Sequence, residues 1–249
     1  DYQKLESVVV LMAAGGDCYD DMRVLGADEG LQRLIGYELP SPDAVRTYAN
    51  ALHDEGLIEQ AKGRRPRGAV ACIPTESQLL AGLAELNVAL FRAVAAQGKA
   101  TRATLDHDAT IQESDKQQAQ PHYKGGRGYQ PSCVYWAEQD LVIGDEYRDG
   151  NVPAGMDNLP LIRRAFNALP ASIVQRYFRA DSACYEQAVL KWLADDKRAD
   201  GPAGPIGFSI SADMTPELRG ASEAVAAERW ELVEERAQET LYCADVEFA

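Results

Sequence analysis

The sequence predicts an α/β protein in two parts, an all-helical region over residues 1–99 and a mixed sheet with helices over residues 100–249. Two observations predict this division. Apolar residues recur with helical spacing through the first hundred residues, between capping residues and glycines. From about residue 100 onward, short β-prone runs alternate with helical segments, a pattern typical of strands joined by crossover helices.

Four long helical segments are expected in the first part, over residues 5–14, 18–36, 39–57 and 73–98. In the third segment Ser41 is a suitable N-cap, and Gly56 is expected to close the helix. In the fourth, Thr75 and Gln78 have the spacing of a capping box.

Five strands are expected in the second part, over residues 101–112, 128–138, 141–151, 172–182 and 206–214. Three helices are expected there, over residues 156–170, 183–196 and 215–238. The first three strands should form a meander, and the later ones should join in parallel through right-handed crossovers. This order is that of a ribonuclease-H-like mixed sheet.

The formal net charge is −14, and residues 220–249 alone carry eight acidic and two basic side chains. Such a chain binds nucleic acid poorly by bulk charge, so DNA binding would depend on local basic patches. The five scattered cysteines indicate reduced thiols in a cytoplasm. The longest clean apolar run, residues 8–14, is too short to span a bilayer. The chain begins without Met or a signal peptide, and we expect it to be a segment of a longer protein.

Two aspartates, Asp106 and Asp108, lie one residue apart on the first expected strand. Alternate residues of a strand share a face, so these carboxylates should point the same way and His107 the other. Asp181 lies where the fourth strand gives way to a helix, and ligand sites of α/β sheets gather at such strand ends. The three carboxylates could bind Mg²⁺ for phosphodiester chemistry. The alternative is that they are solvated strand ends.

A rival interpretation starts from DHDAT, which also fits the DxDxT nucleophile motif of haloacid-dehalogenase-type phosphatases. Residues 144–149, GDEYRD, mimic the later acidic motif of those enzymes. That fold needs several βα units between the two motifs, whereas here the intervening residues are expected to form a two-strand meander. We therefore rank the phosphatase hypothesis below metal-dependent DNA chemistry.

Two basic segments are candidates for contact with a phosphate backbone. The run KGRRPRG covers residues 62–68, and YKGGRGYQP, at residues 123–131, combines basic residues, glycines and tyrosines that could stack on bases. A solvated loop and a plain hairpin turn are the respective alternatives. The candidate DNA-binding residues are Lys62, Arg64, Arg65, Arg67, Lys124, Arg127, Tyr129 and Arg179.

Several ordered segments resemble DDE transposases of bacterial insertion sequences, in the subgroup labelled transposase DDE domain, group 1. These segments are residues 15–36, 39–46, 105–110, 123–131, 148–151 and 179–185, so the resemblance covers nearly the whole chain. It implies a ribonuclease-H-like catalytic domain over residues 100–249, preceded by a helical region, residues 1–99, that helps to bind transposon ends and assemble the synaptic complex.

The resemblance also implies the chemistry. Such an enzyme uses three carboxylates and two Mg²⁺ or Mn²⁺ ions to cut DNA and join 3′-hydroxyl ends to a target. It implies double-stranded DNA, both transposon ends and target, as the partner, a homodimer in the synaptic complex, and a bacterial cytoplasmic, nucleoid-associated location. The first two family carboxylates map onto Asp108 and Asp181, with Asp106 as an accessory or alternative metal ligand.

The third family carboxylate is a Glu set among Tyr, Arg and Lys at fixed spacing, and this pattern does not occur before Ala249. Glu223, Glu228, Glu231 and Glu234 lie on an expected acidic helix but lack those neighbours. We expect the third Glu beyond Ala249, in which case this chain would be inactive alone. A non-catalytic, DNA-binding remnant of a transposase is the alternative hypothesis.

Overall fold

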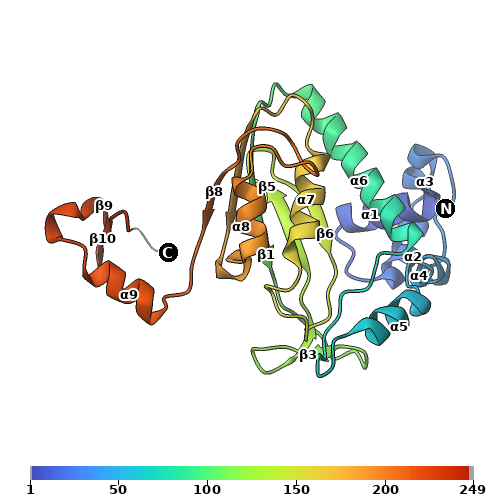
Figure 1. Ribbon diagram of the computed structural model, residues 1–249. Helices are drawn as coiled ribbons and strands as arrows, with labels where there is room; N and C mark the ends of the chain where they lie inside the picture. The colour runs from blue at the N-terminus through green and yellow to red at the C-terminus, as the bar shows by residue number, and fades with distance from the viewer. Residues whose placement is uncertain (1, 247–249) are drawn as a thin grey trace.

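The computed structural model describes residues 2–246, and a five-stranded mixed sheet lies at its centre (Figure 1). The strands are β1 (Arg102–Ala109), β5 (Ser132–Trp136), β6 (Leu141–Glu146), β7 (Gln175–Ala180) and β8 (Gly207–Ile210). They lie in the order β6-β5-β1-β7-β8. The β1–β5 and β5–β6 pairs are antiparallel, whereas β1–β7 and β7–β8 are parallel. This mixed α/β arrangement is consistent with a ribonuclease-H-like fold.

The two faces of β1 differ because its side chains alternate between apolar and charged. Ala103, Leu105 and His107 are buried on the face that packs under helices α7 (Asn158–Ala168) and α8 (Gln187–Ala194). Phe178 of β7 and Val134 of β5 pair with residues of this face and belong to the same apolar core. The charged residues of β1 therefore lie on the opposite face.

A small second sheet lies between β1 and β5 in sequence. It consists of β2 (Gln112–Glu113), β3 (Gln120–Pro121) and β4 (Arg127–Tyr129), in the order β2-β4-β3. The second expected strand, residues 128–138, is therefore two strands, β4 and β5, on either side of Pro131. Proline cannot donate to a ladder, which explains the interruption there.

The N-terminal region consists of short helices: α1 (Tyr2–Ala13), η1 (Tyr19–Asp21), α2 (Met22–Gly26), α3 (Glu29–Ile35), α4 (Pro42–Asn50) and α5 (Glu55–Arg64). The prediction that Gly56 closes the third helix is wrong. Helix α4 ends at Asn50, and Asp54 is the N-cap of the next helix, α5, where its carboxylate accepts a hydrogen bond from Leu57 N at 3.1 Å. A small separate cluster of buried Leu11, Met22 and Val45 holds α1, α2 and α4 together.

Helix α6 (Gln78–Gln97) connects the N-terminal helices to β1 and packs beside β6. Its N-cap is Ser77, whose hydroxyl accepts from Leu80 N at 3.2 Å, so the expected capping box from Thr75 is wrong. Among the described residues, α6 alone has the length and composition to cross a membrane, with a mean hydropathy of 1.6 over its most apolar window. Its Phe91 and Ala95 are buried in the core instead.

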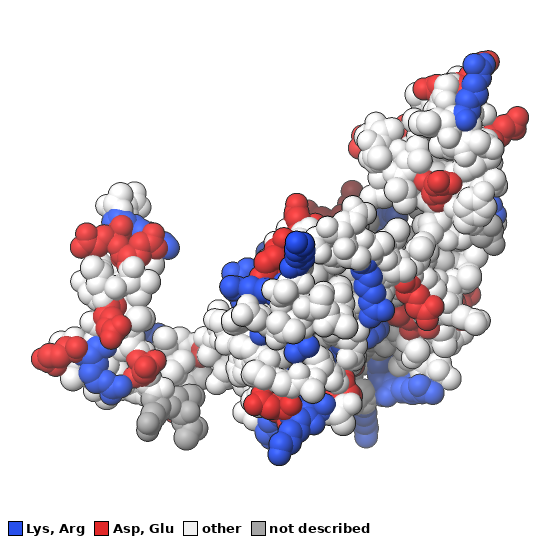
Figure 2. Space-filling view, turned by 90° about the horizontal axis from the view of Figure 1, so that it is seen from above, with Lys and Arg blue, Asp and Glu red and all other residues white. Residues whose placement is uncertain are grey.

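Residues 215–246 project away from the body (Figures 1 and 2). The helix expected over residues 215–238 is wrong: α9 (Pro216–Glu223) is followed by η3 (Ala227–Arg229) and a hairpin of β9 (Glu231–Glu235) and β10 (Thr240–Cys243). Glutamates three and four residues apart would repel on a helix, whereas the hairpin lets Arg236 bind Glu234 and Glu239 at 2.8 and 3.0 Å. Glu231 and Glu234 therefore lie on strand β9, and Glu228 lies on the 3-10 helix η3.

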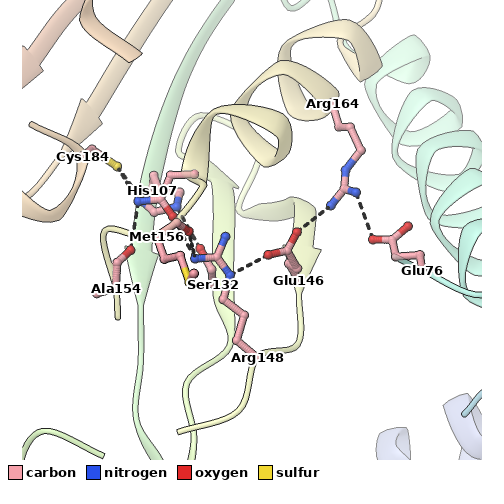
Figure 3. A network of polar contacts seen from close by, with 10 residues as sticks. Glu76, His107, Ser132, Glu146, Arg148, Ala154, Met156, Arg164 and Cys184 are labelled. Atoms are coloured by element: carbon pink, nitrogen blue, oxygen red, sulfur yellow. Dashed lines mark hydrogen bonds and ion pairs between the residues drawn. The ribbon is translucent and has the colours of Figure 1, made fainter. Parts of the chain in front are cut away.

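Behind β1, His107 is held in the core by two polar neighbours. Its Nε2 lies 2.8 Å from Ser132 Oγ, and its Nδ1 lies 3.1 Å from Cys184 Sγ (Figure 3). Burial and the nearby positive charge of Arg148 lower the pKa of His107 to about 4. Burial raises the pKa of the Cys184 thiol to about 12. His107 is thus neutral at physiological pH, and Cys184 is an unreactive thiol.

Next to His107, a chain of ion pairs links β6 to the helices. Arg148, whose side chain is 1% exposed, binds Glu146 at 2.6 Å, and its Nη1 donates to Met156 O and Asn158 Oδ1 (Figure 3). Arg164 of α7 lies 3.6 Å from the same Glu146. Arg148 therefore anchors the segment between β6 and α7 under the sheet.

The His107 environment predicts a specific dependence of stability on pH. Because the pKa of His107 is about 4 when folded and about 6.5 when unfolded, the unfolded state binds more protons between these values. The stabilisation is fully present above pH 6.5 and is lost as the pH falls towards 4, by about 3 kcal/mol in all. Denaturant unfolding of the wild type and His107→Gln at several pH values measures the difference. If the free energy of unfolding changes equally with pH in the wild type and in His107→Gln, the lowered pKa assigned to His107 is wrong.

Replacing Arg148 should destabilise the fold strongly. Arg148→Met leaves Glu146, whose side chain is only 12% exposed, with just the longer contact to Arg164, and removing one partner of a largely buried pair costs about 3–5 kcal/mol. Arg33→Met is the control, because Arg33 forms an exposed pair with Glu29 on α3 and should change stability little. Denaturant midpoints measure both, and equal losses in the two variants would contradict the proposed anchor.

Candidate functional site

The open face of the sheet carries a charged pair at its centre. Asp106 on β1 is the register partner of Arg179 on the parallel strand β7, and residues paired across strands share a face. Arg179 Nε and Nη2 donate to the two carboxylate oxygens of Asp106, both at 2.6 Å. This is a bidentate pair, and it raises the pKa of the Arg179 guanidinium. Asp106 is thereby engaged by a cation of the protein itself.

Asp108 and Asp181 lie together at the carboxyl ends of β1 and β7. The last register pair of the two strands is His107 with Ala180, and each aspartate is the next residue on its strand. Asp108 therefore follows Asp106 on the open face, and Asp181 follows Arg179 on the same face. Both carboxylates raise the pKa of the same imidazole, His107, against the larger effect of burial, which agrees with their placement.

Each of these carboxylates is oriented by one backbone amide. Asp108 Oδ1 accepts from Ala109 N at 2.8 Å. Asp181 Oδ1 accepts from Ala183 N at 2.9 Å and caps η2 (Ser182–Cys184). Both side chains are exposed. The structure therefore positions the two aspartates at a solvent-accessible edge, each with a second oxygen that no other described residue binds.

The antiparallel side of the sheet adds two residues that the sequence analysis did not assign to this site. Cys133 on β5 pairs with Asp108 on one side and with Asp145 on β6 on the other. The three residues thus form a row across the open face. Burial raises the pKa of the Cys133 thiol, and Asp145 and Asp108 raise it further. In β5, whose sequence is SCVYW, the alternation of side chains indicates that Cys133 points away from the core. The register between strands, which places Cys133 beside Asp108 and Asp145, cannot be read from the sequence.

The donor chemistry of Asp108 and Asp181 fits a hard divalent cation, since each is a carboxylate with a free oxygen. Asp106 fits less well, because Arg179 occupies both of its oxygens. Within residues 2–246, the structure gathers no group of three or more His, Cys, Asp or Glu that could hold a metal. Asp108, Asp181 and Asp106 as metal ligands therefore all stay predictions.

The two basic segments lie side by side at the end of the sheet where β1 and β7 terminate (Figure 1). Asn151, five residues after β6, donates from its Nδ2 to Val70 O, two residues beyond the first segment, at 3.2 Å. The neighbouring Asp149 bridges to Tyr129 of the second segment. Burial raises the pKa of Asp149, and Lys62 acts against this shift. Residues 149–151 therefore contact both the second segment and the chain just beyond the first segment.

The candidate DNA-binding residues differ in how firmly the protein already holds them. Arg65 donates to Lys62 O and Val70 O, and Arg127 donates to Ala119 O and Gln117 O, so these two guanidiniums close their own loops. Lys62 Nζ binds Glu59 at 2.6 Å, at the end of α5 rather than in the expected loop.

The others are more available. Arg64 and Arg67 are exposed and have no ion-pair partner in the described part of the chain. The Lys124 ammonium lies 5.7 Å from the Tyr123 ring centroid. Tyr129 packs against Tyr147, with ring centroids 5.0 Å apart. This arrangement does not test whether these residues contact DNA, so their assignment as DNA-binding residues stays a prediction.

The region between the two phosphatase-like motifs argues against the rival interpretation. Residues 110–143, all of which the structure describes, contain only strands, turns and loops. The strand that carries Asp106 is antiparallel to the next strand of the central sheet, β5. A phosphatase of that type needs parallel βα units there. The GDEYRD segment at residues 144–149 instead spans the end of β6 and the buried Arg148.

Comparison with known proteins bears on the whole chain. The family described as Transposase DDE domain group 1 matches residues 3–246 of the 249 residues. Neither the curated proteins nor the solved structures contain a match to the chain. The match includes both the N-terminal helices and the sheet with Asp106, Asp108 and Asp181. The chain therefore belongs to the transposase family Transposase DDE domain group 1.

Proposed function

We propose that this protein cleaves phosphodiester bonds at transposon ends and joins the ends to target DNA, with Asp108 and Asp181 as metal-binding carboxylates. The observation that carries the proposal is the position of the two aspartates, each one residue beyond the last β1–β7 register pair. Carboxyl ends of parallel strands are where α/β sheets bind their ligands. Family membership supports transposase chemistry in general.

The charged residues at this edge have different proposed roles. Asp108 and Asp181 would hold Mg²⁺ or Mn²⁺, the former aspartate kept in place by Ala109 N and the latter by Ala183 N. Bound divalent ions of this kind activate a water and stabilise the leaving oxygen in phosphodiester cleavage. Asp106 has a different role: it fixes the Arg179 guanidinium at the exposed face, beside the carboxylates. A fixed cation there would attract the phosphate backbone towards the two aspartates.

DNA that reaches this edge would also contact the two basic segments, residues 62–68 and 123–131. Arg64 and Arg67 are the residues best placed to contact phosphates, because no described carboxylate pairs with them. Lys124 lies on the turn between β3 and β4 of the second segment. These local charges would act against the overall charge of −14. Location in the bacterial cytoplasm follows as part of the same proposal.

A second candidate function is DNA binding without chemistry. The contacts of residues 149–151 with Tyr129 and with Val70, next to the two basic segments, favour it, since this surface does not depend on the carboxylates. The two functions differ in one measurable respect, which is whether the protein nicks DNA in the presence of a divalent metal.

The metal proposal predicts that Asp108→Ala and Asp181→Ala each abolish Mn²⁺ binding measured by calorimetry. Nicking of supercoiled plasmid in Mn²⁺, measured in a chain extended beyond Ala249 to include the expected third Glu, should fall by about 100-fold or more in each variant, since the metal contributes several kcal/mol to such reactions. Asp213→Ala, an exposed aspartate after β8, is the matched control and should leave both measurements unchanged.

The outcomes separate the two functions. Nicking that survives both substitutions would contradict the assignment of Asp108 and Asp181. Plasmid binding that is equal in the wild type and both variants, with no nicking in Mn²⁺ even by the chain extended beyond Ala249, would favour the non-catalytic function.

A further inference from the structure

Two tyrosine rings lie together on the surface where β6 ends, and we call them the tyrosine pair. Tyr147 is the first residue after β6, and its ring centroid lies 5.0 Å from that of Tyr129 on β4, at an interplanar angle of 39°. Tyr147 is 61% exposed. Within residues 2–246, no group bonds to either hydroxyl. The pair therefore presents an aromatic surface to solvent, and the sequence analysis did not single out Tyr147.

Strand alternation places the tyrosine pair on the same face as the carboxylates. On β6 and just beyond it, buried and half-buried residues alternate with Asp145 and Tyr147, so these two point to the open face. Cys133 and Tyr129 alternate with buried residues in the same way. Cys133 pairs with both Asp145 and Asp108. The tyrosine pair therefore continues the open face beyond the row of Asp108, Cys133 and Asp145.

The backbone under the tyrosine pair is fixed. Gln130 N donates to Arg148 O at 2.8 Å, and Gly150 N donates to Gly128 O at 3.1 Å, so the residues next to the two tyrosines are bonded to each other. The buried Arg148 is itself anchored through its ion pair with Glu146. A surface that is already formed loses little conformational entropy when it binds a ligand.

An exposed aromatic surface of this kind fits a nucleobase whose faces are free. Every base has a π-face, so stacking on a tyrosine ring does not depend on base identity. In a double helix each base is stacked on its neighbours, and it must be unstacked before a protein ring can cover its face. The tyrosine pair therefore indicates unpaired nucleotides rather than intact duplex.

Positive charges flank the tyrosine pair. Arg127 lies two residues before Tyr129, and its guanidinium donates to backbone carbonyl oxygens, so no carboxylate within residues 2–246 neutralises it. Burial raises the pKa of Asp149, which bridges to Tyr129, and the charge of Lys62 opposes this shift. Aromatic rings beside cationic side chains are the combination that binds single-stranded nucleic acid.

We propose that Tyr129 and Tyr147 stack on one or two unpaired bases of a DNA strand whose backbone passes the carboxylate edge. The proposal rests on the proposed function for the identity of the ligand as DNA, and it deepens that function by naming unpaired nucleotides as the form that this edge accepts. An apolar protein or lipid surface is a poorer fit, because it would remove the charged Asp145 and Asp149 beside the pair from water.

Fluorescence anisotropy of the full chain in EDTA tests the proposal, with a labelled single strand of about 12 nucleotides and its duplex. Tyr147→Leu keeps an apolar side chain against Tyr129 but removes the π-face. It should raise the Kd for the single strand by about 10-fold and the Kd for the duplex by less than about 2-fold. Tyr147→Phe, which keeps the ring, should bind like the wild type.

Tyr242→Leu is the matched control, because Tyr242 is 55% exposed on β10 of the projecting residues 215–246. It should leave both dissociation constants unchanged. Circular dichroism checks that each variant is folded.

A fully abasic strand of the same length tests whether the base, rather than the backbone, is bound. Such a strand keeps its phosphates but offers nothing to stack. It should bind the wild type more weakly than the normal strand does. Tyr147→Leu should weaken binding of the abasic strand by less than about 2-fold, because the base and the ring make the same contact and its loss is counted only once.

Several outcomes would overturn the proposal. These are equal single-strand affinities in the wild type and Tyr147→Leu, an equal loss in Tyr242→Leu, an equal loss for the duplex, or a wild type that binds normal and abasic strands alike. EDTA removes divalent metal, so none of these results bears on Asp108 and Asp181. A chain that binds unpaired DNA through Tyr147 but never nicks DNA would support the tyrosine pair while contradicting the proposed cleavage.

Discussion

The parallel register between β1 and β7 is the constraint on which the site depends. It places Asp106 opposite Arg179 and leaves Asp108 and Asp181 as the next residues on the two strands. The same register puts Leu105 opposite Phe178 on the reverse face, in the apolar core. A shift by one residue would bury the charged residues and expose the apolar ones. Core packing therefore holds the carboxylates in place.

The sheet separates two kinds of polar chemistry. On the helix side, His107 and Arg148 are buried, hydrogen-bonded and structural. On the open side, Asp108 and Asp181 are exposed, and each keeps an oxygen without a partner among the described residues. A buried polar group must be satisfied by its neighbours, whereas an exposed carboxylate can exchange water for a ligand. This difference supports the proposal that the open face carries the chemistry.

Much of the architecture could be predicted from local sequence signals. The strands with Asp106 and Arg179 follow from alternation, and the family match confirms the resemblance. The hairpin after residue 230 was missed because its pairing and the Arg236 contacts are set by the turn, not by periodicity. The row of Asp108, Cys133 and Asp145 was missed because register depends on the whole sheet. Local patterns place residues on strands but do not align one strand with another.

The small sheet of β2, β3 and β4 is an insertion between two strands that pair directly, β1 and β5. Because the β1–β5 register is held by buried residues such as Leu105 and Trp136, the length of the insertion does not set it. Closing a longer loop costs little extra entropy. The segment could thus be lengthened or exchanged while the β1–β5 register and the carboxylate edge stay intact.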